Sequence, residues 1–414
     1  MSGFKVKLRN NLDPKWVEHQ GKDFLYLQDP LMLSNNSMLI PAPIVPLLRM
    51  LDGTKILEDL KTVLDATMGL DFPSATIEDL INQLDKTYLL DNVNFKNTSN
   101  RFLDEYRDGP SRSMMHSGSI YPADSAKVSE IIMEFCEKTP ITTPKPDEGA
   151  LVGLLSPHID FARGGSTYAL TWQAAAPSLE DIELVIIFGT DHIGSGSIII
   201  PTLQNYSTPF GVLKTDKDIV NNLISIFGPD IALSEELHHR SEHSIELAIL
   251  WMHAFMKNKS LKILPILCGS FYKYMSGDEL PAEESFFSET LDILAEAVNN
   301  HRALIIAAGD LAHVGPVFGD SSKITPGAKH SLGLHDNESI AAICDGDAEL
   351  FFQISKAEND KRRLCGMAPI YLMMKTIERA YGQKAKGFSM GYDQCPADIN
   401  GGSLVTITGA LLYA

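Results

Sequence analysis

The sequence has few of the features that mark membrane, secreted or nucleic-acid-binding proteins. It contains no run of about 18 apolar residues, so no transmembrane helix is expected. Its cysteines number five, an odd count, and none forms a C-x-x-C pair, which argues against a disulfide framework. Lys and Arg total 35 against 53 Asp and Glu, and the resulting net charge of −18 repels a phosphate backbone. We therefore expect neither a membrane segment nor a nucleic-acid partner.

The amino terminus also lacks the apolar stretch of a signal peptide, because residues 1–5 lead into alternating charge. Together with the cysteine usage, this indicates a reducing, cytoplasmic setting. An apolar fraction of 44% and a charged fraction of 21% are typical of globular proteins. A chain of 414 residues can bury a large core without disulfides. Against this ordinary background, the twelve histidines draw attention.

The amino-terminal quarter of the chain predicts a small domain of its own. Thr54 is placed to cap a helix with apolar residues at helical spacing, and a second helix starts near Thr76. Residues 88–95 predict a strand and turn, and the polar residues 97–112 predict a linker. Short helices closed by a hairpin are typical of a winged helix, and this segment resembles the PqqD-type peptide-recognition module. A packing or dimerisation module is the alternative.

A DNA-binding role does not fit this winged-helix-like segment. Residues 1–110 hold 12 Lys and Arg against 16 Asp and Glu, so the net charge is 12 − 16 = −4. A surface of that sign offers no basic face for phosphates.

Short apolar runs alternate with amphipathic helical patterns from residue 151 onward. The runs are Leu151–Leu155, Leu184–Phe188, Ile263–Leu267 and Leu304–Ala308. Continuous apolar runs of this length are typical of strands buried on both faces. We therefore predict an α/β fold with a central mixed or parallel sheet flanked by helices. The predicted domains are residues 1–108 and residues 109–414.

Polar residues of unusual type follow these runs. His158 comes after the first run and His192 after the second, and Asp310 and His313 come after the last. Open α/β sheets bind ligands at the carboxyl ends of their strands, so the three histidines are candidates for one pocket. A single histidine after a strand is often a polar cap, but three in the same position favour a metal or acid–base site. If Asp310 and His313 share a helical turn, Asp310 either orients His313 or caps the helix start.

Two further residues stand at predicted helix starts. His243 is a pocket candidate, whereas we expect the preceding His238 and His239 to be solvated loop residues. Cys365 also opens a helix, where a thiolate is stabilised for metal ligation or nucleophilic chemistry. The alternative for Cys365 is a small buried apolar side chain, the usual fate of a free cysteine.

Six motifs together resemble the Memo family, whose bacterial and archaeal members are called AmmeMemoRadiSam system protein B. In chain order they are His116–Pro122, Ser156–His158, Asp191–His192, Glu242–Glu246, Asp310–His313 and Cys365–Ile370. The resemblance implies a fold like that of the class III extradiol ring-cleaving dioxygenases, which hold non-haem Fe(II) with two histidines and a glutamate. It implies His158, His192 and Cys365 as metal ligands, with the cysteine in place of the carboxylate.

The same resemblance implies that His313 moves protons with Asp310 beside it, and that His243 positions an oxygen anion. A thiolate is softer than a carboxylate, so the implied ligand set suits Fe(II) or copper, with zinc also compatible.

Three functions follow from this ligand set and from the family's name. The first is a metal-dependent redox protein, with a dioxygenase-like pocket for a small-molecule or peptide substrate. The second is a non-catalytic binding protein, with a peptide, a radical-SAM protein or an AMMECR-type protein as its partner. A zinc hydrolase ranks third, because no glutamate base is placed beside the implied ligands.

Overall fold

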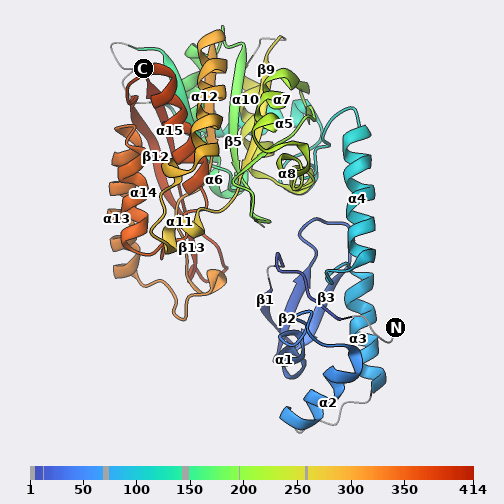
Figure 1. Cartoon of the computed structure of the whole chain (residues 1–414). Coiled ribbons are helices and arrows are strands. Elements are labelled where there is room, and N and C mark those ends of the chain that lie inside the picture. The colour runs from blue at the N-terminus through green and yellow to red at the C-terminus, as the bar shows by residue number, and fades with distance from the viewer. Residues whose placement is uncertain (1–4, 13, 69–73, 142–148, 195, 257–259) are drawn as a thin grey trace. The chain divides into compact units, whose positions relative to one another are not determined.

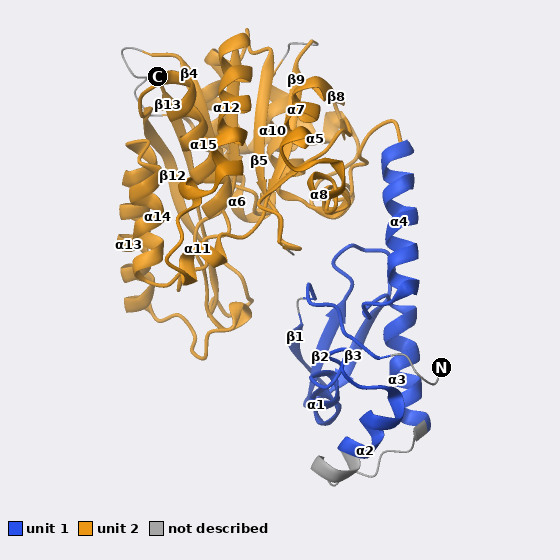
Figure 2. Ribbon diagram, in the orientation of Figure 1, with its two compact units in different colours: residues 1–108 blue, residues 109–414 orange. Residues whose placement is uncertain are grey.

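The computed structural model describes residues 5–12, 14–68, 74–141, 149–194, 196–256 and 260–414. The chain divides into two compact units, residues 1–108 and residues 109–414 (Figure 2). Each unit has hydrophobic clusters of its own, so each is described separately.

Residues 1–108 combine a three-stranded antiparallel sheet with helices. The elements are β1 (Lys15–His19), β2 (Lys22–Gln28), β3 (Ser37–Pro41), η1 (Ala42–Ile44), α1 (Val45–Leu48), α2 (Leu57–Met68), α3 (Ser74–Lys86) and α4 (Val93–Asp108). Alternate residues of the sheet are buried, among them Leu27 of β2 and Ile40 of β3, as expected for a sheet with one covered face. They pack with Leu60 of α2 and with Ile77 and Leu84 of α3.

The two helices predicted here from apolar spacing are confirmed as α2 and α3, but other local predictions are wrong. The strands precede the helices, and no strand covers the described residues 88–95, where Leu90 forms an isolated bridge with Leu8. Residues 97–108 are not a linker, because α4 runs through them to Asp108. Asn92 caps this helix by accepting the N–H of Phe95. The polar composition is that of an exposed helix.

Thr54 is not the cap of α2. Its backbone N–H and its hydroxyl both donate to the carboxylate of Asp52, and the helix begins three residues later, at Leu57. The Asp-x-Thr pair therefore closes a turn before the helix.

Residues 109–414 form a mixed, ten-stranded sheet covered by helices (Figure 1). The strands are β4 (Leu151–Ser156), β5 (Leu184–Thr190), β6 (Ile199–Pro201), β7 (Tyr206–Thr208), β8 (Gly211–Thr215), β9 (Lys262–Cys268), β10 (Ala303–Ala308), β11 (His313–Val314), β12 (Lys386–Pro396) and β13 (Leu404–Tyr413). Their order is β11-β13-β4-β10-β5-β9-β8-β7, with β12 on β13 and β6 on β9.

Helices of many lengths connect these strands. The α-helices are α5 (Ser125–Lys138), α6 (Phe161–Ala175), α7 (Lys217–Phe227), α8 (Pro229–Ala232), α9 (His238–Ser241), α10 (Ser244–Phe255), α11 (Tyr272–Ser276), α12 (Ser285–Asn300), α13 (Pro326–Cys344), α14 (Ala348–Ala357) and α15 (Met367–Tyr381). Short 3₁₀ helices are η2 (Ala176–Ser178), η3 (Pro281–Glu283) and η4 (Pro316–Phe318). Among the described residues, none of these helices is both long and apolar enough to cross a membrane.

The four predicted apolar runs are the four neighbouring strands β4, β10, β5 and β9, and they pair in parallel. Their side chains alternate between two cores. In β5, Val185 and Ile187 join the cluster that contains α6 and α10, while Ile186 and Phe188 join the cluster that contains α12 and α15. Because helices cover both faces, the predicted runs within these strands are apolar on both sides of the sheet. The α/β prediction is confirmed, and the carboxyl ends of the four strands share one edge.

Candidate metal centre

Predicted residues from three distant segments meet at this edge of the sheet. His158 lies two residues after β4, His192 two residues after β5, and Cys365 two residues before α15. The Sγ atom of Cys365 is 3.2 Å from Nε2 of His158. The rings of His158 and His192 have centroids 5.0 Å apart. The fold thus brings His158 and Cys365, which are 207 positions apart in the sequence, into contact.

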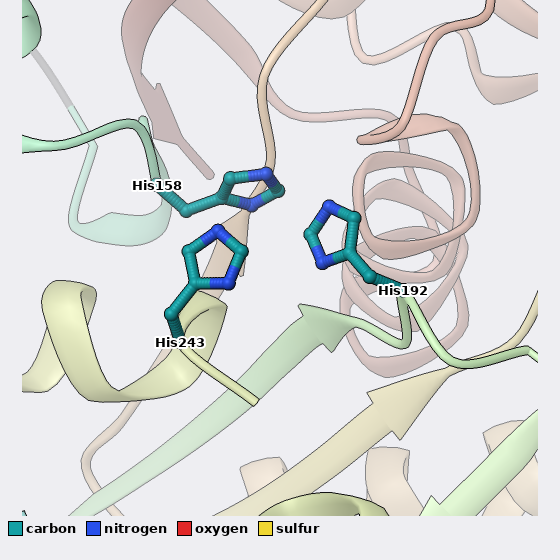
Figure 3. A group of neighbouring side chains, drawn as sticks. All are labelled: His158, His192 and His243. Atoms are coloured by element: carbon teal, nitrogen blue, oxygen red, sulfur yellow. The ribbon is translucent and has the colours of Figure 1, made fainter. Parts of the chain in front are cut away.

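His243, at the start of α10, joins this group (Figure 3). Its ring centroid lies 5.3 Å from that of His158 and 4.8 Å from that of His192. One ligand atom from each of these three histidines lies within 4.8 Å of the other two. A second set with the same spacing contains His158, Asp310 and Cys365. The structure therefore clusters five of the six predicted site residues.

Glu242, to which the sequence patterns assigned no role, orients two of the histidines. Its buried carboxylate lies 3.1 Å from Nδ1 of His192 and 3.1 Å from Nδ1 of His243. It also accepts the backbone N–H groups of His192, His243 and Ser244. Burial alone would raise the pKa of Glu242, but the two histidines hold it well below its usual range. With Nδ1 engaged, each imidazole presents Nε2 as its remaining ligand atom.

Neighbouring groups also orient His158, which is buried at the bottom of the site. Its Nδ1 lies 3.0 Å from the carbonyl oxygen of Ala308, which leaves Nε2 on the side of Cys365. Its backbone N–H donates to Asp310, whose second oxygen is 3.7 Å from Nε2. Burial alone would lower the pKa of His158, but the charges of Asp310 and Cys365 outweigh it and raise that pKa to about 9.

Cys365 has the electrostatic surroundings of a thiolate. Burial would raise the pKa of its thiol, yet the neighbouring His158 and His313 bring it well below its usual value. The pKa of Cys395 shifts in the opposite direction, because burial prevails there and raises it to about 12. A thiolate is the form that ligates metals. Imidazoles whose Nδ1 atoms are already engaged, beside a cysteine with the surroundings of a thiolate, are donors that fit a metal ion.

The predicted pairing of Asp310 with His313 on one helical turn is wrong. Residues 309–312 are irregular, and His313 begins β11, which pairs with β13. The carboxylate of Asp310 serves His158, while Nδ1 of His313 lies 3.2 Å from the carbonyl oxygen of Leu311. The strand pairing of 313–314 extends the backbone, so the two residues do not share a helical turn. His313 nevertheless lies close enough to Cys365 to lower the pKa of its thiol.

The expectation that His238 and His239 are solvated is also wrong. Both belong to the short helix α9 and are buried. His239 contacts the hydroxyl of Tyr206 at 2.6 Å through Nδ1 and the carbonyl oxygen of Ile200 at 2.8 Å through Nε2. Burial lowers the pKa of His239 to about 3, so its imidazole is neutral. The two ring nitrogens of His239 therefore contact buried groups of β6 and β7 that lie 39 and 33 positions earlier in the sequence.

Replacing Glu242 with glutamine is expected to weaken metal binding about 10- to 100-fold, the usual effect of removing a group that orients a ligand. The amide keeps the size of the carboxylate but cannot accept both Nδ1–H groups and the three backbone N–H groups. Metal affinity is measured by competition with a chelator, and circular dichroism checks the fold. Glu296→Gln, at an exposed position of α12, is the matched control and should bind like the wild type. Unchanged affinity in Glu242→Gln would show that the carboxylate does not orient these ligands.

Comparison with known proteins identifies the family of this chain. The family model described as Memo-like protein matches residues 112–401. A MEMO1 family protein of Aquifex aeolicus is 24% identical over 94% of this chain and 96% of its own length. The memo-1 homolog of Caenorhabditis elegans is 26% identical over 64% of this chain and 71% of its own. A MEMO1 family protein of Methanocaldococcus jannaschii is 28% identical over 57% and 75%, respectively. Because the family model covers well over half of the residues, the chain belongs to the Memo-like protein family.

Proposed function

We propose that this protein is a metal-dependent redox protein whose iron or copper ion is held by His158, His192 and Cys365. The observation that carries the proposal is the 3.2 Å contact between Sγ of Cys365 and Nε2 of His158. That nitrogen faces the thiol because Nδ1 is already engaged by the carbonyl oxygen of Ala308. A soft thiolate beside imidazoles suits iron and copper.

A bound iron or copper ion would supply one-electron redox chemistry at this point, whereas zinc would fit the same donors without it. The exposure of the side chains indicates where a substrate arrives. The side chain of His158 is 2% exposed and forms the floor, while those of His192 and His243 are 35% and 33% exposed. A substrate therefore approaches from the side of His192 and His243.

Two histidines that are outside the proposed ligand set supply proton chemistry. His243 has Nδ1 paired with Glu242, so Nε2 is the atom that can donate to, or accept from, an oxygen of the substrate. His313, whose charge acts on Cys365, is the second group that can hold or release a proton. In this proposal Asp310 supports His158 and not His313. The radical-SAM and AMMECR-type partners stay predictions.

The test is reconstitution of protein purified without oxygen, separately with Fe(II), Cu(I) and Zn(II). We expect His158→Ala to lose one equivalent of metal relative to the wild type. We expect the iron or copper form to consume O₂ or to change oxidation state on exposure to it, and the zinc form to do neither. His330→Ala, at an exposed position of α13, is the control and should retain all metal. Wild-type protein that binds no metal stoichiometrically, or whose iron and copper forms are inert to O₂, would refute the proposal.

A further inference from the structure

We propose a second cation site, built from Asp191, Glu235 and His238, that shares no residue with the centre described above. Each of these side chains offers one ligand atom, and the three atoms lie within 4.8 Å of one another. The side chains of Asp191 and His238 are almost completely buried, and Glu235 is half-buried. The proposal does not depend on the function proposed for the first centre.

The spacing of the donors fits coordination of a transition-metal ion. Nδ1 of His238 is 2.9 Å from Oδ2 of Asp191. Two donors that each lie about 2.1 Å from one ion are separated by about 3 Å in octahedral coordination and by about 3.4 Å in tetrahedral coordination. The contact therefore has the length expected for neighbouring ligands as well as for a hydrogen bond.

Both carboxylates are oriented by backbone groups before any ion binds. Oδ1 of Asp191 accepts the N–H of Ile193, and Oε2 of Glu235 accepts the N–H of Ser197. Ligands held by their surroundings lose little conformational freedom when an ion binds.

The charges of the cluster also favour a cation. Two carboxylates stand beside one imidazole, and like charges in a buried place repel one another unless a positive charge lies between them. A divalent ion coordinated by all three side chains would offset both carboxylates.

The donor chemistry differs between the two sites, which makes them separable. Two carboxylates and one imidazole are harder ligands than the imidazoles and thiolate of the first centre, and they suit Mn²⁺ or Zn²⁺. Asp191 follows β5 directly and His238 begins α9, so an ion here would tie the loop of His192 to the segment that leads to Glu242. We infer a site that stabilises the surroundings of the first centre.

The experiment counts bound metal in the full-length protein. After removal of metal and equilibrium dialysis against Zn²⁺, we expect two equivalents in the wild type, one in His238→Asn, one in Cys365→Ser and none in the double variant. With Mn²⁺, electron paramagnetic resonance should show bound ion in the wild type and in Cys365→Ser, and should lose it in His238→Asn. His330→Asn is the matched control and should bind two equivalents of Zn²⁺.

Two results would overturn the second site: a single wild-type equivalent that Cys365→Ser abolishes, or two equivalents retained by His238→Asn. A single wild-type equivalent that survives in Cys365→Ser but not in His238→Asn would instead support this site and count against the first. If His238→Asn does not fold, Glu235→Gln replaces it, since its side chain is only half-buried. Retention of both equivalents by Glu235→Gln would also contradict the proposal.

Discussion

Replacing Cys365 with serine is expected to abolish metal binding at the centre formed with His158 and His192. Loss of a group that merely orients a ligand costs roughly 10- to 100-fold in affinity, so loss of a ligand should exceed about 100-fold. A serine hydroxyl is a much poorer ligand for copper or iron than a thiolate, and it is far harder to ionise than the thiol of Cys365, whose pKa its neighbours lower. The change replaces one sulfur atom with an oxygen atom and should leave the fold intact.

The affinity of this variant is measured by chelator competition, and the sulfur–metal bond is followed with Cu(II) or Co(II) by its thiolate charge-transfer absorption. We expect that absorption in the wild type and in Cys136→Ser, and its absence in Cys365→Ser. Cys136 is a suitable control because it is a half-buried thiol of α5 whose pKa is raised by burial. If Cys365→Ser binds metal within about threefold of the wild type, the cysteine is not a ligand.

Replacing Arg112 with methionine is expected to destabilise residues 109–414 by about 3–5 kcal/mol, the usual cost of leaving one member of a buried ion pair without the other. Arg112 pairs with Glu246 of α10, and both side chains are buried. Its guanidinium also donates to the carbonyl oxygens of His239, at 2.6 Å, and Glu242, at 2.7 Å. The variant would therefore leave a buried carboxylate and two carbonyl groups without this donor.

Urea unfolding measures this effect through the intrinsic fluorescence of Trp172 and Trp251, which are both fully buried in residues 109–414. The control is Arg302→Met, because the ion pair of Arg302 with Asp181 lies at the surface and should contribute less than about 1 kcal/mol. The double variant Arg112→Met, Glu246→Met should be more stable than Arg112→Met alone, since it removes the unpaired charge. A single variant within about 1 kcal/mol of the wild type would contradict the expected role of the pair.

Much of the larger unit could be predicted from local sequence. A run such as Leu184–Phe188 is apolar at every position because helices cover both faces of the sheet, and that pattern identifies a buried parallel strand. Once the strands are known, the positions of His158 and His192 after them predict a shared edge. The metal-ligand roles of these residues stay predictions.

The errors arose where a local pattern was compatible with more than one structure. Polar residues suggest a linker, yet residues 97–108 belong to an exposed helix whose cap is Asn92. Asp310 and His313 have the spacing of a helical turn, but His313 begins β11, which pairs with β13. His238 and His239 lacked an apolar pattern, and their burial depends on acceptors supplied by Asp191 and Ile200.

By itself, the sequence determined the layer architecture, the four parallel strands and the edge on which His158 and His192 lie. The reason is that the spacing of apolar residues within each short segment reflects which of its faces are buried. Only the tertiary structure decided how the site is organised. Glu242 orients His192 and His243, and Asp310 supports His158, through contacts between residues far apart in the chain. Such contacts depend on strand order and on the packing of α9 and α10, which a local pattern does not encode.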